Sequence, residues 1–131
     1  MSIRTGRWLG RNGGGLEILA VAPGGHVSAR YQTKVGKPNP NAWFDAHGMT
    51  DGRLIGFTVL WQNSTEQHGS LATFTGRYLG AGDADGFGDS ARERIEAQWH
   101  LARLFDDDDP GKPHAMWETF LTNATVLYWT P

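Results

Sequence analysis

Apolar and polar side chains alternate with a period of two along much of this chain, while the 3.6-residue period of an amphipathic helix is weak throughout. The alternation is cleanest over residues 95–104. One side of that segment carries Ile95, Ala97, Trp99 and Leu101, and the other carries Glu96, Gln98 and His100. A strand whose two faces differ in this way packs one face on a core and turns the other toward solvent.

Eight segments are predicted as β-strands on this pattern, each bounded by residues that favour turns. They cover residues 6–10, 16–22, 26–35, 43–49, 54–62, 70–79, 95–104 and 117–128. Eight short strands at near-regular spacing indicate a sandwich or a barrel. Closure removes both exposed sheet edges, so we predict an all-β fold, an eight-stranded antiparallel up-and-down barrel, in one domain spanning residues 1–131.

The composition limits the kind of partner that this chain can have. It has six tryptophans, 18 glycines, no cysteine and a net charge of −2. The lack of cysteine excludes disulfides, zinc–thiolate sites and thiol nucleophiles. The charge balance gives no footprint for nucleic acid, and no apolar run approaches the roughly 20 residues of a membrane-spanning helix. Many large aromatic residues indicate either an aromatic core or a binding cavity, and neither nucleic acid nor a membrane is expected as a partner.

Groups that could carry catalysis or hold a metal are sparse. His68 and Ser70 lie close in the sequence, but there is no Gly-x-Ser-x-Gly pattern and no evident aspartate to orient the histidine. The histidines are scattered, and the acidic run 106–109 lacks the ligand spacing of a calcium loop, so no metal site is predicted. The first residues lack the apolar core of a secretory signal, which leaves a cytoplasmic protein or a mature secreted form.

Three segments together resemble the avidin and streptavidin family. They are GFTVLWQN at 56–63, ATFTGRY at 72–78 and QWHL at 98–101, and their order and spacing make the match specific. The segments TGRW at 5–8 and ARY at 29–31 fit the first and third strands of that family, and residues 61–66 are similar to the short dimeric bacterial avidins. The resemblance runs from Thr5 to about Trp129 and implies the same closed barrel.

The resemblance also implies a biotin site at the open end of the barrel, with biotin as a ligand and no cofactor. The apolar wall would consist of Trp61, Phe74, Trp99 and Leu101. Tyr31 and Thr33 would face the ureido group, and Ser70 and Ala72 would lie near the ring sulfur and the carboxylate tail. The backbone of Val35, Gly36 and Lys37 would lie in a loop that closes over the ligand. Trp117 matches a tryptophan that tetrameric relatives lend to a neighbouring subunit, so a homodimer or homotetramer is expected.

The sequence departs from the family pattern at the polar end of this site. Gly10 and Gly14 stand where the family has an asparagine and a serine, and Asn12 is a possible replacement. The polar residue of the last strand aligns with Thr125, or with Ala124 if one residue is deleted, and Asn123 shares the side of Thr125. Two readings remain open: a biotin binder of reduced affinity, or a pocket re-cut for another small molecule, with an enzyme as the runner-up to a binding protein.

The segment 81–92 is longer than the turn that relatives have there. It is rich in glycine and aspartate and shows no strand or helix pattern. Surface loops tolerate insertions, which favours a plain insertion, and a lid over the ligand is the alternative.

Overall fold

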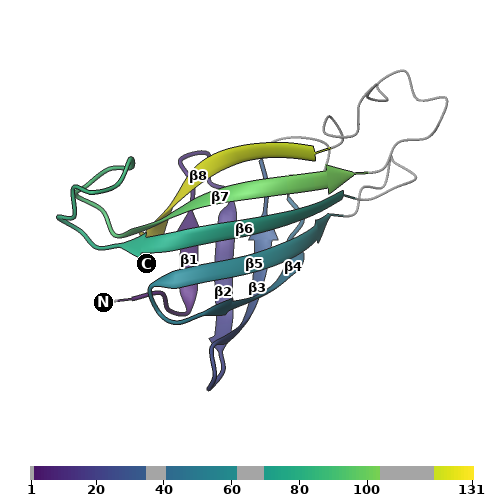
Figure 1. Ribbon diagram of the computed structural model, residues 1–131, viewed down its shortest axis with the longest axis horizontal. Helices are drawn as coiled ribbons and strands as arrows, with labels where there is room; N and C mark the ends of the chain where they lie inside the picture. Colours follow the sequence, from purple (N-terminus) through teal and green to yellow (C-terminus); the bar gives the residue numbers. More distant parts are fainter. Residues whose placement is uncertain (1, 35–40, 62–69, 104–119) are drawn as a thin grey trace.

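The computed structural model describes residues 2–34, 41–61, 70–103 and 120–131, which form one closed barrel of eight antiparallel strands (Figure 1). Each strand pairs with the next in the chain, and the last pairs with the first. The strands are β1 (Gly6–Leu9), β2 (Gly15–Val21), β3 (His26–Gln32), β4 (Phe44–Thr50), β5 (Leu54–Trp61), β6 (Ser70–Leu79), β7 (Arg94–Arg103) and β8 (Phe120–Thr130). The predicted fold class is confirmed.

The predicted strand segments match the observed strands to within a few residues. The largest difference is at the third strand, which ends at Gln32 instead of residue 35. Residues 117–119 of the eighth predicted segment lie outside the described residues. The alternation that identified β7 places Ile95 and Ala97 in the core and leaves His100 exposed, as its polar face predicts.

The up-and-down order gives the barrel two different ends. Both chain termini and the β6–β7 connection gather at one of them, which we call the closed end (Figure 1). At the opposite end, the open end, β5 finishes at Trp61, β6 begins at Ser70 and β7 finishes at Arg103. The ends of the β5–β6 and β6–β7 ladders therefore border the open end.

The closed end is filled by aromatic rings and a charged pair. Trp8 is fully buried, and its ring centroid lies 5.1 Å from that of Trp129 and 6.2 Å from that of Tyr78. The Arg4 guanidinium lies 3.9 Å from the centroid of the Trp129 ring and donates two hydrogen bonds to the Glu93 carboxylate. The Tyr78 hydroxyl donates to the same carboxylate at 2.6 Å, and the Trp8 indole N–H donates to the Arg4 carbonyl oxygen at 3.0 Å. Rings and hydrogen bonds thus close this end of the barrel.

The β6–β7 connection packs on the outside of the barrel. The backbone N–H groups of Phe87 and Gly88 donate to the Glu96 carboxylate at 2.8 and 2.7 Å. Arg94 is fully buried, donates to the same carboxylate and to the Asp83 carbonyl oxygen, and so links the loop to β7. Because this loop lies at the closed end, it is not a lid over the open end, and the alternative of a surface insertion is the one that fits (Figure 1).

Within the described ranges there is no helix long and apolar enough to cross a membrane. The same residues contain no group of three or more His, Cys, Asp or Glu side chains placed to hold a metal ion.

Candidate ligand-binding cavity

The inward-facing side chains of β5 to β8 form successive rows across the sheet, because the registers of the three ladders match. The outermost row at the open end holds Trp61, Ser70 and Arg103. The next row is apolar and holds Val59, Ala72, Leu101 and Leu121. The third holds Phe57, Phe74, Trp99 and Asn123. The fourth holds Ile55, Gly76, Ala97 and Thr125. Polar groups therefore lie at the mouth and deep inside, with apolar side chains between them.

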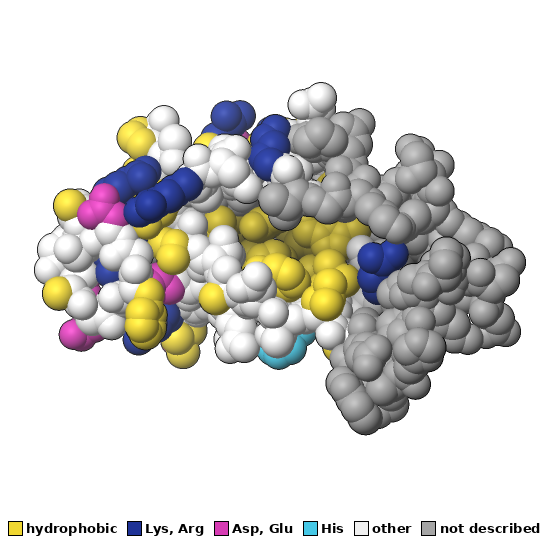
Figure 2. Space-filling view, turned by 90° about the horizontal axis from the view of Figure 1, so that it is seen from above, with side chains coloured by type: hydrophobic (Ala, Val, Ile, Leu, Met, Phe, Trp, Pro, Cys, Tyr) yellow, Lys and Arg dark blue, Asp and Glu magenta, His cyan; other side chains and the backbone are white. Residues whose placement is uncertain are grey.

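These rows surround a cavity of about 590 Å³, which lies within the range of small-molecule sites. Figure 2 shows its hydrophobic wall as a yellow hollow. The cavity is lined by Gly10, Asn12, Gly14, Tyr31, Gln32, Thr33, Lys34, Trp61, Ser70, Ala72, Phe74, Trp99, Leu101, Arg103, Leu121, Asn123, Ala124, Thr125 and Leu127.

The aromatic rings hold one another in place along one wall of the cavity. Phe74 stacks on Phe57 with ring centroids 4.5 Å apart and an interplanar angle of 10°, and its centroid lies 5.0 Å from that of Tyr31. Trp61 meets Tyr31 edge-on at 5.6 Å, and Trp99 lies 6.4 Å from Phe74. Trp61 and Phe74 are almost fully buried, whereas Trp99 is half-buried. These contacts fix the wall before any ligand arrives, which lowers the entropic cost of binding.

Tyr31 contributes the most buried hydroxyl of the cavity. Its ring lies among the core aromatics, and burial raises the pKa of Tyr31 to about 12. The group therefore stays protonated near neutral pH and can donate one hydrogen bond. Within the described part of the chain no hydrogen bond joins this hydroxyl to another residue, and a ligand atom in the cavity can accept its hydrogen bond.

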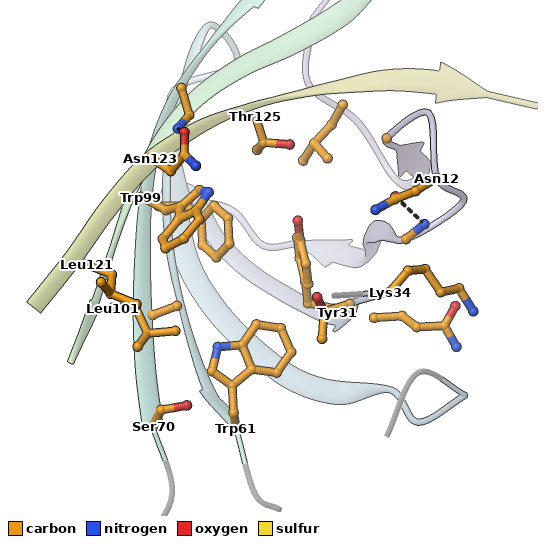
Figure 3. A pocket seen from close by; sticks show the side chains of 18 of the residues that line it. Asn12, Tyr31, Lys34, Trp61, Ser70, Trp99, Leu101, Leu121, Asn123 and Thr125 are labelled. Carbon is orange, nitrogen blue, oxygen red and sulfur yellow. Dashed lines mark hydrogen bonds between the residues drawn. The ribbon is translucent and has the colours of Figure 1, made fainter. Parts of the chain in front are cut away.

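The β1–β2 hairpin shapes the polar end of the cavity. The Gly10 N–H donates to the Gly14 carbonyl oxygen at 2.7 Å, and the Gly14 N–H donates to the Asn12 side-chain oxygen at 3.1 Å. This bond leaves the Asn12 amide nitrogen facing the cavity (Figure 3). Asn12 thus places a donor near the position that Gly10 and Gly14 leave without a side chain.

The two glycines differ in the space around them. A Cβ at Gly14 would lie 2.7 Å from the Gln32 carbonyl oxygen, which is closer than real Cβ atoms approach. A Cβ at Gly10 would have its nearest neighbours at 3.4 Å, an ordinary contact. The backbone of this hairpin therefore excludes a serine at Gly14 and accepts a side chain at Gly10.

β8 supplies two polar side chains to the cavity, of which Asn123 is exposed and Thr125 is half-buried. Asn123 and Thr125 both line it, and their side chains lie above Trp99 in the view of Figure 3. The Asn123 side-chain oxygen accepts a hydrogen bond from the Ala124 N–H at 2.8 Å, which leaves its amide nitrogen to donate. Ala124 also lines the cavity, but its side chain lies on the outward face of β8, so only its backbone borders the cavity.

The structure brings most of the residues suggested by the sequence together around this one cavity. Those that line it are Asn12, Tyr31, Thr33, Trp61, Ser70, Ala72, Phe74, Trp99, Leu101, Asn123 and Thr125. Val35, Gly36, Lys37 and Trp117 lie outside the described residues. That the lining residues contact a ligand remains a prediction.

Sequence reasoning missed five lining residues that carry side chains: Gln32, Lys34, Arg103, Leu121 and Leu127. It weighed Ala124 only as an alternative for the last strand. Alternation could have found three of them. Arg103 lies two residues beyond Leu101, Leu121 lies two before Asn123 and Leu127 lies two beyond Thr125, so each faces the same side of its strand as that predicted residue.

The described lining contains no carboxylate and no imidazole. Its charged side chains are Lys34 and Arg103, both cationic. Because the pKa of Tyr31 is raised to about 12, this hydroxyl stays protonated near neutral pH and cannot accept a proton as a general base. General acid–base catalysis needs a titratable group within hydrogen-bond reach of the substrate, and the described residues offer no carboxylate or histidine for that role. The arrangement suits binding.

An up-and-down barrel that is packed at one end and holds a deep aromatic cavity at the other defines a small-molecule binding protein. The model of the Avidin family matches residues 2–121, and the chain belongs to that family. Members of the avidin family are binding proteins and not enzymes, so the sequence-based family assignment and the preference for binding over catalysis are confirmed.

Solved structures with the same fold cover nearly the whole chain. Apo shwanavidin shares 20% identity with a TM-score of 0.71, over 97% of this chain and 100% of its own. A rhizavidin–biotin complex shares 22% identity with a TM-score of 0.70, over 98% and 93%. The biotin binding protein from chicken shares 22% identity with a TM-score of 0.69, over 97% and 95%. At these identities the likeness supports the fold.

Proposed function

We propose that this protein binds biotin, or a small heterocycle of similar shape, in the cavity at the open end of the barrel. The observation that carries the proposal is the cavity of about 590 Å³ enclosed by Tyr31, Trp61, Phe74 and Trp99 in a chain of the avidin family. Two of the structural relatives, the rhizavidin complex and the chicken protein, are named for biotin. The aromatic wall would remove ligand ring surface from water, at about 25 cal/mol per Å².

We further propose that the affinity for biotin is lower than the family's extreme values. Gly10 and Gly14 offer no side-chain hydrogen bond to a ureido group, and Asn12 replaces only part of what is lost. Each hydrogen bond lost in a dry pocket costs roughly 1–3 kcal/mol, and every 1.4 kcal/mol is a factor of ten in affinity. The aromatic wall of the site is retained, while its polar end has fewer side chains that can form hydrogen bonds with the ligand.

Titration calorimetry with biotin tests the proposal, with Trp99→Ala as the matched variant. Trp99 is half-buried and lines the cavity, so its loss should leave the barrel folded and weaken binding about 30-fold, or about 2 kcal/mol. Leu19→Ala, on an exposed position of β2, serves as the control and should bind as the parent does. No heat, no thermal shift and no retention on biotin resin would refute the proposal.

We propose a homo-oligomer, with the outer face of β5 to β8 as the contact between two copies. The outward row nearest the open end is apolar and consists of Leu60, Leu71, Ala102 and Phe120. The next two rows hold Thr58, Thr73, His100 and Thr122, and then Gly56, Thr75, Gln98 and Ala124. None of these positions carries Asp, Glu, Lys or Arg, so the face can meet a copy of itself without like-charge repulsion.

The family resemblance assigns subunit contact to Trp117, which would reach the pocket of a neighbouring subunit. Trp117 lies outside the described residues and precedes Phe120, the first residue of β8, by three positions in the sequence. Light scattering after size exclusion should give a dimer or tetramer for the parent and a smaller particle for Leu71→Glu. Leu19→Glu places the same charge on an exposed leucine of β2 and should leave the assembly intact. A monomeric parent would remove both this face and Trp117 from the proposal.

A further inference from the structure

We propose that Asn12 is a site of spontaneous deamidation, which changes the hydrogen-bonding groups at the edge of the cavity as the protein ages. Asn12 is followed by Gly13, and this is the only Asn-Gly pair in the sequence. Both residues are exposed at the tip of the β1–β2 hairpin, and Asn12 lines the cavity. The effect on ligand binding rests on the proposed function, whereas the reaction itself does not.

The reaction joins the side chain of Asn12 to the main chain of the next residue. The Gly13 nitrogen loses its proton and forms a bond to Asn12 Cγ, the bond from Cγ to Nδ2 breaks, and ammonia leaves. Water then opens the resulting succinimide ring at either of its two carbonyl groups. The products are aspartate and isoaspartate, and the main chain of isoaspartate runs through the former side chain. The reaction consumes only water, which reaches the exposed tip of the hairpin.

The conformation of the hairpin tip favours this attack. The Asn12 Oδ1 accepts a hydrogen bond from the Gly14 N–H at 3.1 Å, so the side chain folds back along its own main chain and closes a ring that contains the Gly13 nitrogen (Figure 3). The same hydrogen bond draws electrons from Cγ and makes it a better electrophile. Gly13 has a φ of +88°, and a Cβ placed on it would meet no atom within 4 Å. The attacking nitrogen therefore belongs to a residue with no side chain and with open space beside it.

One hydrogen bond opposes the reaction and limits its rate. The Gly13 N–H donates to the Gly10 carbonyl oxygen at 3.0 Å, and this bond must break before the nitrogen can attack. It lies outside the β1–β2 ladder, whose last pair is Leu9 with Gly15. A hydrogen bond at an exposed hairpin tip opens at a lower free energy than one inside a sheet, so the reactive state remains accessible in the folded protein.

Asn123 provides a contrast within the same cavity. It is exposed and lines the cavity as Asn12 does, but the next residue, Ala124, carries a side chain. Both residues lie in the β7–β8 ladder, where pairing holds the main chain extended. The three remaining asparagines of the sequence precede proline, alanine or serine. Asn12 should therefore react before the other asparagines.

Conversion of Asn12 replaces a hydrogen-bond donor with a negative charge. The amide nitrogen that faces the cavity is lost, and the carboxylate that takes its place only accepts hydrogen bonds. A ligand carbonyl group at this position then meets an anion, and the affinity for such a ligand should fall about ten-fold. Isoaspartate also adds a carbon atom to the main chain of the hairpin and so displaces the group further.

Incubation of the folded protein at pH 8 and 37 °C, followed by peptide mapping with mass spectrometry, tests the reaction. The peptide that contains Asn12 should gain the mass difference between an amide and an acid and should separate into two products. The peptide that contains Asn123 should stay unchanged over the same time. Asn12→Gln should suppress the change, because attack on the longer side chain closes a less favourable ring. Deamidation at Asn12 no faster than at Asn123 would overturn the proposal.

Calorimetry with Asn12→Asp, which creates one of the two products directly, tests the consequence for binding. The affinity for biotin should fall about ten-fold, and parent protein that has aged to full conversion should bind no more tightly than this variant. A variant that binds biotin as tightly as the parent would contradict the effect on the cavity. A fresh parent that binds no biotin would refute the biotin proposal, and the rate measured at Asn12 would still decide whether this residue is the modification site.

Discussion

The two ends of the barrel use similar side chains for opposite purposes. At the closed end the polar groups of Trp8, Tyr78 and Arg4 all bind protein atoms, and the rings pack without leaving space for a guest. At the open end the rings of Tyr31 and Trp99 pack along one wall only, and the Tyr31 hydroxyl has no partner in the described part of the chain. The comparison teaches that satisfied aromatic groups give stability, whereas unsatisfied ones beside a cavity are available for binding.

The largest effect is expected from the closed end. Trp8→Ala removes a fully buried indole and should lower the free energy of unfolding by about 3–5 kcal/mol, because the cavity left behind cannot collapse completely. Urea unfolding followed by fluorescence measures this change. Trp99→Ala is the control from the open end, and its cost in stability should be clearly smaller. Equal losses in the two variants would contradict the division of the barrel into a packed end and a binding end.

Gly10 and Gly14 of the β1–β2 hairpin allow a comparison of stability at the polar end of the cavity. Gly14→Ser forces a Cβ against the Gln32 carbonyl oxygen and should cost about 1–3 kcal/mol of stability. Gly10→Ser introduces the same side chain in the same hairpin, where the nearest contacts are ordinary, and should cost much less. Thermal unfolding of the pair decides this, and a Gly14→Ser variant as stable as the parent would show that the hairpin can shift.

The Arg4–Glu93 pair makes part of the stability of the closed end dependent on pH. The hydrogen bond from Arg4 holds the pKa of Glu93 below its ordinary value of 4.5. A carboxylate whose pKa is lowered by folding stabilises the protein fully above the unfolded pKa, and this contribution is lost as the pH falls through the folded pKa. Glu93→Gln should cost about 1–2 kcal/mol at pH 7 and should flatten the loss of stability below about pH 4.5.

Urea unfolding at several pH values between 3 and 7 measures both parts of this prediction. Asp45→Asn is the control, because Asp45 is an exposed carboxylate on the outward face of β4. A variant at Glu93 with the same acid sensitivity as the parent would exclude this pair as the cause.

The smallest effect is expected at the deep hydroxyl of the open end. Tyr31→Phe keeps the ring and its contacts and removes only an oxygen atom that has no protein partner in the described residues. Stability should stay within about 0.5 kcal/mol of the parent, while affinity for biotin should fall by roughly 1 kcal/mol, about five-fold. Calorimetry and thermal unfolding of the same sample measure the two quantities. A large loss of stability with unchanged affinity would show that the Tyr31 hydroxyl stabilises the fold and does not contribute to ligand binding.

The barrel was predictable from the sequence because each strand shows its buried face by alternation alone. Ile55, Phe57, Val59 and Trp61 share a face in the sequence and are all buried in the structure. The cavity wall was predictable for the same reason once the family resemblance gave the inward side. These inferences need only local periodicity, which neighbouring residues carry.

The contacts that depend on distant segments were not predictable. Glu96 lies on the polar face of β7, as its pattern indicates, yet the loop from residue 80 covers it and binds its carboxylate. From the sequence, Gly14 indicates only that the side chain found in the family is absent. The position of the Gln32 carbonyl oxygen in the structure shows that no side chain fits there. Neither fact follows from periodicity, because each depends on how two strands and a loop meet in space.

Both termini and the β6–β7 loop share the packed end of the barrel. A tag, a surface tether or a fused enzyme attached at any of these three points would therefore project from the closed end of the barrel. The entrance would face the surrounding solution even on a densely coated support. Immobilised protein should then take up ligand at the same rate as protein free in solution, whichever of the three attachment points is used.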